Sequence, residues 1–250
     1  MKIKTLSFVL PLLIIFFCGC ATSNQHQTQM LPESQVLPVK TMDKVYSHYK
    51  LYPAFSKYFT KENCSLVMDK YYYINCYSYD YKGTKAVAYK IESKILNMGT
   101  AGKRPAFKSD PQIPQAYRTK TQDYTRSGYD RGHTLSNQSM NATLQAQAST
   151  FLMSNITPQN PQINQRVWRK AEDRERFLAK QKGSAEVLNI VFYAKDKSKI
   201  QYIKNGIAIP ELYVKVIEAG DVKECYEYPN HKVEDERLES YRADCERFVK

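Results

Sequence analysis

The sequence predicts one α+β domain with a mixed, mainly antiparallel central sheet and flanking helices. An aromatic, β-forming run over residues 71–81 precedes a run over 85–93 that alternates small apolar and polar side chains, a pattern typical of a hairpin. Residues 162–182 have the composition of a helix and contain neither glycine nor proline. The chain has 250 residues, of which 42% are hydrophobic, and shows no internal repeat and no second core. These features exclude wholesale disorder and suit a single domain with appendages.

The other elements follow in order from local composition. Residues 82–84 read Lys-Gly-Thr and form the turn of the hairpin. Residues 99–128 are rich in Gly, Pro, Asp and Ser and predict a long irregular segment. Gly183 is the predicted C-cap of the helix. Beyond it we expect strands over 187–194 and 207–217 and a charged terminal helix over 233–249.

Residues 1–19 predict a signal peptide. Two lysines precede an apolar run over residues 6–17 that is too short to cross a bilayer. The run leads into Phe-Cys-Gly-Cys-Ala, which resembles the bacterial lipobox, so we expect Cys20 to carry lipid, with ordinary signal cleavage nearby as the alternative. Residues 20–44 are polar and lack apolar periodicity, which predicts a lipid-anchored flexible tether before a single domain at 45–250.

The same features predict where the protein resides. We expect export and a cell-envelope lipoprotein attached to a membrane through its N-terminal lipid. Ala21, rather than aspartate, follows the lipid cysteine, and this favours the outer membrane of a two-membrane cell. Without lipid the protein would be secreted or periplasmic.

The remaining cysteines agree with export. Once Cys18 is removed and Cys20 modified, four are left, and no CxxC or Cys/His spacing suggests zinc. An even set in an oxidising compartment suggests two bridges, for which three pairings exist. We favour the two local pairs, and free buried thiols are the alternative. These pairs are Cys64–Cys76 and Cys225–Cys245.

The charge of the chain points to a polyanionic partner. Lys and Arg number 37 against 25 Asp and Glu, a net charge of +12. Loss of residues 1–19 removes two lysines and no acids, so 12 − 2 leaves +10 on the mature chain. Such a charge supplies attraction to nucleic acid that does not depend on base sequence. No recognition helix, zinc finger or base-reading module is evident.

His133 is the best-placed candidate for a general base. Of the other three histidines, His26 lies in the tether, His48 precedes the core and His231 lies in a charged C-terminal segment. An imidazole suits proton transfer near neutral pH. A structural role for the histidine is the alternative.

A stripe along the predicted helix supplies further polar groups. Asn164, Trp168, Glu172 and Arg176 are spaced four apart and share one face. Trp168 is interpreted as core packing. In a regular helix about 12 Å of rise separates Asn164 from Glu172, so the two are not expected to bind one ion directly. The asparagine oxygen suits Mg²⁺, and the glutamate would hold metal-bound water.

Six arginines lie in or near these segments. Guanidinium groups suit phosphate oxygens and the negative charge that builds up during phosphoryl transfer. We assign this role to Arg104, Arg131 and Arg176. The other three are interpreted as a solvated helix face paired with Asp173 and Glu175. They are Arg166, Arg169 and Arg174.

At these residues the chain resembles the DNA/RNA non-specific endonucleases of the ββα-metal class. The first motif of that family, Asp-Arg-Gly-His, is present at residues 130–133. An upstream arginine followed by an aromatic residue and Asp-Pro matches Arg104, Phe107 and residues 110–111. The chain departs from the family at Thr134, where leucine is common. The second motif is found at Asn155, Pro158, Gln159, Asn164, Trp168 and Glu172.

The resemblance implies a role for each matching residue. His133 would activate water, and Asn164 would be the sole direct protein ligand of Mg²⁺, for which Mn²⁺ can substitute. Glu172 would orient the waters of the ion, and Asn155 would position either the His133 segment or the substrate. Arg104, Arg131 and Arg176 would stabilise charge at the phosphate. The implied activity is cleavage of DNA and RNA, without sequence or sugar preference, to 5′-phosphate and 3′-hydroxyl ends.

Three other functions compete with this interpretation. A non-catalytic nucleic-acid-binding envelope lipoprotein would keep the charge, but binding alone requires neither His133, Asn164 nor Glu172. A metal-dependent phosphodiesterase or phosphatase for small molecules would need a closed pocket. Membrane binding by charge alone is unnecessary if the chain carries lipid.

Overall fold

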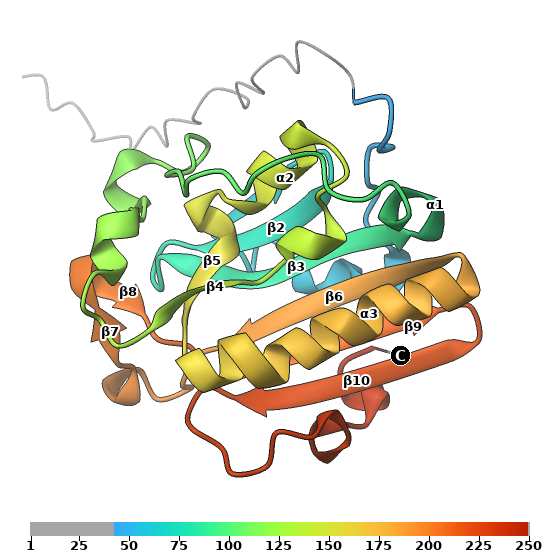
Figure 1. The fold of residues 1–250 in the computed structure, drawn as a ribbon. Helices are drawn as coiled ribbons and strands as arrows, with labels where there is room; N and C mark the ends of the chain where they lie inside the picture. The colour runs from blue at the N-terminus through green and yellow to red at the C-terminus, as the bar shows by residue number, and fades with distance from the viewer. Residues whose placement is uncertain (1–42, 250) are drawn as a thin grey trace, which may run out of the picture. The chain divides into compact units, whose positions relative to one another are not determined.

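A six-stranded antiparallel sheet forms the centre of the computed structural model, which describes residues 43–249 (Figure 1). The strand order is β1-β2-β3-β6-β9-β10, and every neighbouring pair is antiparallel. The predicted α+β fold with a mainly antiparallel sheet is therefore confirmed. The strands are β1 (Leu66–Asp69), β2 (Tyr73–Ser78), β3 (Gly83–Glu92), β6 (Ser184–Phe192), β9 (Leu212–Ala219) and β10 (Val222–Pro229).

Smaller elements surround this sheet. Two short antiparallel pairs, β4–β5 and β7–β8, lie outside it. Their bounds are β4 (Asp130–His133), β5 (Ile156–Gln159), β7 (Tyr202–Ile203) and β8 (Ile207–Ala208). The α-helices are α1 (Ser93–Leu96), α2 (Leu144–Thr150) and α3 (Arg169–Lys182). Single 3₁₀ turns occur at Pro53–Tyr58, Gln115–Tyr117, Thr121–Tyr124, Asn137–Ser139, Met153–Asn155, Lys197–Lys199, Lys204–Gly206, Leu238–Tyr241 and Cys245–Arg247.

The sheet is buried on both faces. Alternate residues of a strand point to opposite sides, so in β9 Tyr213 and Ile217 face the cluster that includes α3, whereas Val214 and Val216 belong to the cluster on the other side. Figure 1 shows α3 running along β6 and β9. The opposite face is covered by Phe55 and by the C-terminal residues. Burial on both sides explains why these strands are apolar along most of their length.

The predicted hairpin and helix are both present, with one difference in each. Strands β2 and β3 pair antiparallel, but the turn lies at residues 79–82 rather than 82–84, because Gly83 and Thr84 already pair with Ser78 and Tyr77 as the start of β3. Gly183 ends α3 with φ of +88°, a conformation that glycine adopts without strain. The first part of the predicted helix, Ile163–Trp168, is instead a π-helical turn that runs directly into α3. A π turn holds more residues than an α turn, and it changes the direction in which the residues before it point.

Two predictions for the C-terminal half need correction. The expected strand over 207–217 is split into β8 and β9 by a break at Pro210, which cannot donate a ladder hydrogen bond. The expected helix over 233–249 is wrong, because the tail pairs with the sheet instead. Ala243 donates its backbone N–H to Cys225 of β10, and an isolated bridge joins Tyr226 to Arg242.

Both predicted disulfides are present. Cys64–Cys76 ties the segment before β1 to β2, with Cα atoms 5.2 Å apart. Cys225–Cys245 ties the C-terminal tail to β10, with a Cα separation of 5.3 Å. The second bridge therefore reinforces the pairing that replaces the expected terminal helix.

The predicted signal peptide, Cys20 and nearly all of the tether lie outside the described residues. Residues 42–250 form one compact unit. Among the helices of residues 43–249, none has the length and apolar character needed to cross a membrane.

Candidate active site

Strands β4 and β5 and the helix that follows β5 form the frame of the site. The two strands pair antiparallel, so that Asp130 is opposite Gln159 and His133 is opposite Ile156. Gly132 allows this close pairing, because an added Cβ would lie 2.5 Å from the Cβ of Gln159. The motif glycine is therefore required by packing, and it brings the His133 strand against β5 just before the helical segment begins.

A cavity of about 240 Å³ opens over this frame. Five of the predicted site residues line it together, although they are far apart in the sequence. They are Arg104, Arg131, His133, Asn164 and Glu172. The remaining lining residues, which include a third arginine, were not predicted as site residues. They are Ser136, Asn137, Gln138 and Arg169.

The imidazole of His133 is held between two aromatic rings. Its centroid lies 5.5 Å from that of Phe107 and 4.9 Å from that of Phe151. Nε2 is buried and has no hydrogen-bond partner among the described residues. Burial, with a smaller contribution from the charge of Arg104, lowers the pKa of His133 to about 3. The ring is therefore neutral at physiological pH and has a free nitrogen, which is the form that a general base requires.

Two arginines lie against the same pair of rings. The guanidinium carbon of Arg131 is 5.4 Å from the centroid of Phe107, and that of Arg104 is 5.4 Å from the centroid of Phe151. These cation–π contacts fix the positive charges beside the imidazole. An anion entering the cavity would meet them together with the base.

The side chain of Asn164 has a defined orientation. Its Nδ2 donates to Asp130 Oδ2 at 2.8 Å, and Gln165 Nε2 donates to the same carboxylate oxygen at 2.8 Å. With the amide nitrogen engaged in this bond, Oδ1 remains as the acceptor of a residue that lines the cavity. Asn164 lies within the π-helical turn, so the regular-helix spacing expected between it and Glu172 does not apply. Both residues line one cavity.

Glu172 lies in α3 with its carboxyl group in this cavity. Burial raises the pKa of the group to about 7, against the opposing influence of the Lys215 charge. A carboxylate with such a pKa is costly to ionise unless a cation binds beside it. It is the only acidic side chain among the cavity residues, whereas Arg104, Arg131 and Arg169 contribute three positive charges.

A divalent cation fits these residues. Among residues 43–249 no group of three or more His, Cys, Asp or Glu side chains is arranged to hold a metal. An ion in the cavity would depend on few protein ligands, and Mg²⁺ is commonly bound in this way because it keeps several waters. Asn164 Oδ1 and the Glu172 carboxylate are the hard oxygen donors that such an ion prefers, and its charge would favour the ionised form of Glu172.

Asn155 acts away from the cavity. It is fully buried, its Oδ1 accepts from the backbone N–H of Leu135 at 2.8 Å, and its Nδ2 donates to the carbonyls of Leu135 and Thr150. Its own carbonyl accepts from the N–H of Thr134 at 2.9 Å. Of the two expected roles, this geometry supports positioning of the His133 segment, because the side chain does not reach substrate.

Arg176 lies outside the catalytic cavity. Its Nη1 donates to the hydroxyls of Ser136 and Ser139 at 3.2 Å, and its Nη2 pairs with Asp173 Oδ1 at 2.5 Å. The guanidinium thus connects α3 to the segment that follows the His133 strand. It is engaged by protein acceptors rather than offered to a phosphate in the catalytic cavity.

A buried ionic network below the cavity was missed in the sequence. Glu175 and Lys215 are both fully buried and form an ion pair. The Glu175 carboxylate also accepts from Tyr89 at 2.9 Å and from Ser139 at 2.6 Å. Glu175 had been assigned to a solvated helix face, and nothing in the local sequence marks it as buried. Only the position of Lys215 in the middle of an apolar strand was a signal.

The three remaining arginines do not pair with Asp173 and Glu175 as expected. Two of them form ion pairs with acids of other elements: Arg166 with Glu236 at 3.2 Å and Arg174 with Glu224 at 2.6 Å. Arg169 instead lines the catalytic cavity. It precedes Glu172 by three residues, so helical spacing alone places the two on one face and could have identified it.

Comparison with known proteins finds a matching family model and several similar nucleases. A family model described as DNA/RNA non-specific endonuclease matches residues 52–249. Mitochondrial endonuclease G of Homo sapiens is 28% identical over 153 residues, which is 58% of this chain and 52% of the relative. A nuclease of Nostoc sp. is 34% identical over 122 residues, covering 46% of this chain and 44% of the relative. The mitochondrial nuclease of Saccharomyces cerevisiae is 29% identical over 211 residues, covering 78% and 64%.

A solved structure extends the likeness to the fold. A chain of the crystal structure of the EndoG/EndoGI complex superposes with a TM-score of 0.66 and 25% identity. The match covers 79% of this chain and 89% of the other. The chain spans between 44% and 64% of the length of the three curated relatives above. Because the family model covers most of the sequence, the chain belongs to the DNA/RNA non-specific endonuclease family.

Proposed function

We propose that this protein is a Mg²⁺-dependent endonuclease that hydrolyses phosphodiester bonds of DNA and RNA without sequence or sugar preference. One observation carries the proposal: a single cavity holds a neutral histidine with a free nitrogen, an oriented asparagine oxygen, a glutamate of raised pKa and three arginines. Members of the family are typically metal-dependent. Binding alone would require the arginines but neither the base nor the oxygen donors.

The chain's own residues account for most of the chemistry. Nε2 of His133 takes a proton from water as the water oxygen forms a bond to phosphorus. The bond between phosphorus and the 3′ oxygen breaks, and that oxygen leaves with the electron pair and takes up a proton. The products are a 5′-phosphate and a 3′-hydroxyl. Arg104, Arg131 and Arg169 offset the negative charge that grows on the phosphate oxygens.

Asn164 and Glu172 are the residues that would hold the cation. Mg²⁺ bound there supplies positive charge at the leaving oxygen. Asp130 keeps the Asn164 oxygen turned away from its own carboxylate by holding the amide nitrogen. Contacts to backbone phosphate rather than to base edges give little sequence preference.

The decisive experiment compares plasmid DNA and RNA as substrates. Wild-type protein and a His133→Ala variant are incubated with each, with Mg²⁺ or Mn²⁺ and with a chelator. We expect the wild type to cut both substrates in either metal and neither in chelator, and His133→Ala to lose about 10²- to 10⁴-fold in rate. Plasmid that is retarded on the gel but remains uncut in both metals would overturn the proposal in favour of a non-catalytic nucleic-acid-binding lipoprotein.

We also propose that Cys20 carries lipid and anchors the domain to a membrane of the cell envelope, with the outer membrane favoured. The support is the lipobox-like sequence that ends at this cysteine and the polar tether that follows it. Metabolic labelling with a fatty acid, followed by membrane fractionation, tests this proposal. Label on the wild type but not on Cys20→Ser is expected, and unlabelled wild-type protein in the soluble fraction would contradict it.

A further inference from the structure

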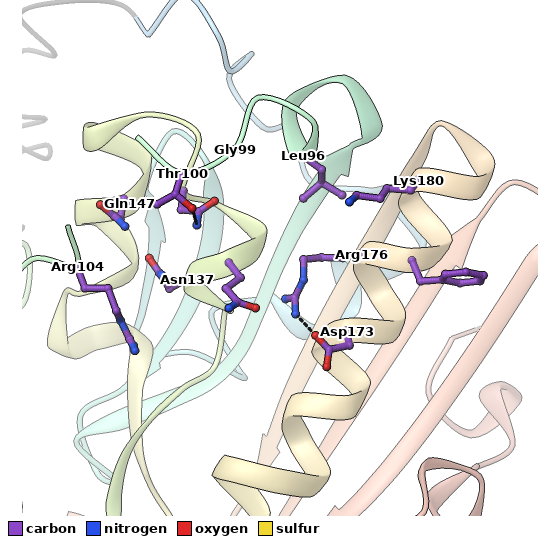
Figure 2. A pocket seen from close by; sticks show the side chains of 12 residues that line it. Leu96, Gly99, Thr100, Arg104, Asn137, Gln147, Asp173, Arg176 and Lys180 are labelled. Carbon is purple, nitrogen blue, oxygen red and sulfur yellow. Dashed lines mark hydrogen bonds and ion pairs between the residues drawn. The ribbon is translucent and has the colours of Figure 1, made fainter. Parts of the chain in front are cut away.

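A second cavity of about 560 Å³, which we call the side cavity, adjoins the catalytic cavity. The two share Arg104, Asn137 and Gln138 in their linings, so they are immediate neighbours. Figure 2 shows Asp173, Arg176 and Lys180 of α3 on one wall of the side cavity. Arg104, Asn137 and Gln147 lie on the opposite wall.

The charge of the side cavity is positive. Lys180 is exposed and has no ion pair among the described residues, and the same holds for Arg104. Arg176 is already compensated by Asp173, whose side chain is 62% exposed. Two cations are therefore available to a ligand: Lys180 on the α3 wall, and Arg104 on the opposite wall, which also lines the catalytic cavity.

Two amide side chains add an independent observation. Asn137 and Gln147 are 9% and 1% exposed, and both line the side cavity. Asn137 Oδ1 and Gln147 Nε2 have no hydrogen-bond partner among residues 43–249. Buried polar atoms are normally paired, and a group without a partner calls for an explanation. A bound ligand that offers one donor and one acceptor would satisfy both.

The direction of the side cavity matches that of a nucleic-acid strand. From Glu172 to Lys180, α3 rises about 12 Å. A strand of duplex DNA presents a phosphate about every 3.4 Å of helix axis. A strand running along α3 with its scissile phosphate near Glu172 would thus bring a phosphate about three to four steps further along within reach of Lys180. The sugar and base edges between these phosphates would lie beside the two amides.

We propose that the side cavity binds the nucleotides adjacent to the scissile phosphate on one strand. Lys180 contacts a backbone phosphate, while Asn137 and Gln147 bond to polar atoms of the sugar or base. The assignment rests on the proposed endonuclease function. It adds three residues to the substrate interface that the family motifs do not include, and it directs the strand along α3 rather than across it.

The first test compares two lysines of the same helix. Lys180→Gln and Lys182→Gln each remove one positive charge near the end of α3, but Lys182 pairs with Asp221 and does not line the side cavity. Each is made in the full-length chain that carries His133→Ala, so that the strand stays intact. Affinity for a fluorescein-labelled single-stranded oligonucleotide is measured by anisotropy between about 50 and 200 mM salt.

We expect the two variants to differ in salt dependence. Lys180→Gln should weaken binding about three- to tenfold and reduce the slope of log affinity against log salt by about 0.7, the value for one lost phosphate contact on a single strand. Lys182→Gln should keep the parent slope. Equal slopes for both variants would overturn the assignment of Lys180.

The second test separates substrate binding from stability. Gln147→Met keeps the length of the side chain and removes its polar atoms. A structural glutamine would lose stability on this change, whereas a buried amide nitrogen without a partner in the free protein should not. We therefore expect an unchanged or higher Tm together with weaker oligonucleotide binding. A lower Tm with unchanged affinity would overturn the role given to the amides.

The outcomes also distinguish this proposal from the proposed function. The binding measurements use a chain in which cleavage is strongly slowed, so the difference between the variants reports on binding in the side cavity and not on cleavage. If wild-type protein cuts neither DNA nor RNA but Lys180→Gln still reduces the salt slope, the endonuclease proposal fails and the binding subsite stands. If the wild type cuts and neither variant affects binding, only the subsite fails.

Discussion

Glu172 and Glu175 lie three residues apart on α3, and their carboxyl groups have very different surroundings. Glu175 is fully buried, paired with Lys215 and bonded to Tyr89 and Ser139. Glu172 lines the catalytic cavity, and burial raises its pKa to about 7. The partners of Glu175 are all side chains of the protein itself. Glu172 has no ion pair among the described residues, so its main partner would be a bound cation. In this helix, the carboxylate without an ion pair among the described residues is the one that lines the catalytic cavity.

The largest effect should come from breaking the buried pair. Glu175→Gln leaves Lys215 charged and without its counter-ion, which should lower the free energy of unfolding by about 3–5 kcal/mol and the Tm by roughly 6–20 °C. Glu172→Gln should keep or raise the Tm, because it removes a partly buried carboxylate that has no ion pair among the described residues. Thermal unfolding followed by circular dichroism, without added metal, measures both.

A double substitution sharpens this prediction. Glu175→Leu combined with Lys215→Met replaces the ion pair by apolar side chains of similar size and should recover most of the lost stability. The same Tm loss in Glu172→Gln and Glu175→Gln would show that the two carboxylates are equivalent and would remove the basis of the comparison.

The next effect concerns catalysis. Glu172→Gln should lower kcat by about 100-fold or more at saturating Mg²⁺, because the amide cannot supply the charge that favours a dication in the cavity. The Glu175→Leu, Lys215→Met double variant should cut plasmid at a rate much closer to wild type, provided that it is assayed below its Tm. A Glu172→Gln enzyme with nearly wild-type kcat would place the essential carboxylate elsewhere.

The smallest effect is a shift in pH dependence. Burial lowers the pKa of His133 to about 3 and raises that of Glu172 to about 7. As the pH falls from neutrality, Glu172 is therefore protonated first, while His133 stays neutral and able to accept a proton. We expect the acidic limb of kcat/KM to move to lower pH as Mg²⁺ is raised, because metal and proton compete for Glu172.

A plasmid-cleavage profile at two Mg²⁺ concentrations tests this expectation. Glu172→Gln is the matched control, since its residual activity should lack the metal-dependent shift. An acidic limb near pH 6.5 that does not respond to metal would mean that His133 titrates with its ordinary pKa.

Local sequence was enough to place the hairpin, α3, both disulfides and five of the nine residues that line the catalytic cavity. Each of these depends on short-range features: turn residues, helix composition, cysteine spacing and two motifs in order. Glu175 and Lys215 are different, because each resembles a surface charge until β9 is packed against α3. The irregular C-terminal tail was missed for the same reason. Its composition over 233–249 favours a helix, but pairing with β10, which is distant in the sequence, outweighs that preference.

The rise expected between Asn164 and Glu172 rested on a premise that fails for a third reason. The estimate assumed a regular α-helix, whereas the segment contains a π-helical turn over Ile163–Trp168. Nothing in its composition distinguishes it from α-helix, because its residues are ordinary helix formers. Only the bonds that Asn164 and Gln165 make to Asp130 indicate why the wider turn is kept.

Because of the π-helical turn, the site depends on the number of residues in the segment Ile163–Trp168 as well as on which residues they are. Removing one residue between Ile163 and Trp168 would let the segment relax to an α-helix while every side chain downstream stayed in place. Asn164 would then rotate about 100° around the helix axis, away from Asp130 and from the cavity. The segment should therefore accept many substitutions at its exposed positions but no single deletion. In a deletion scan, loss of any one residue from this segment should harm activity as much as substitution of a motif residue does.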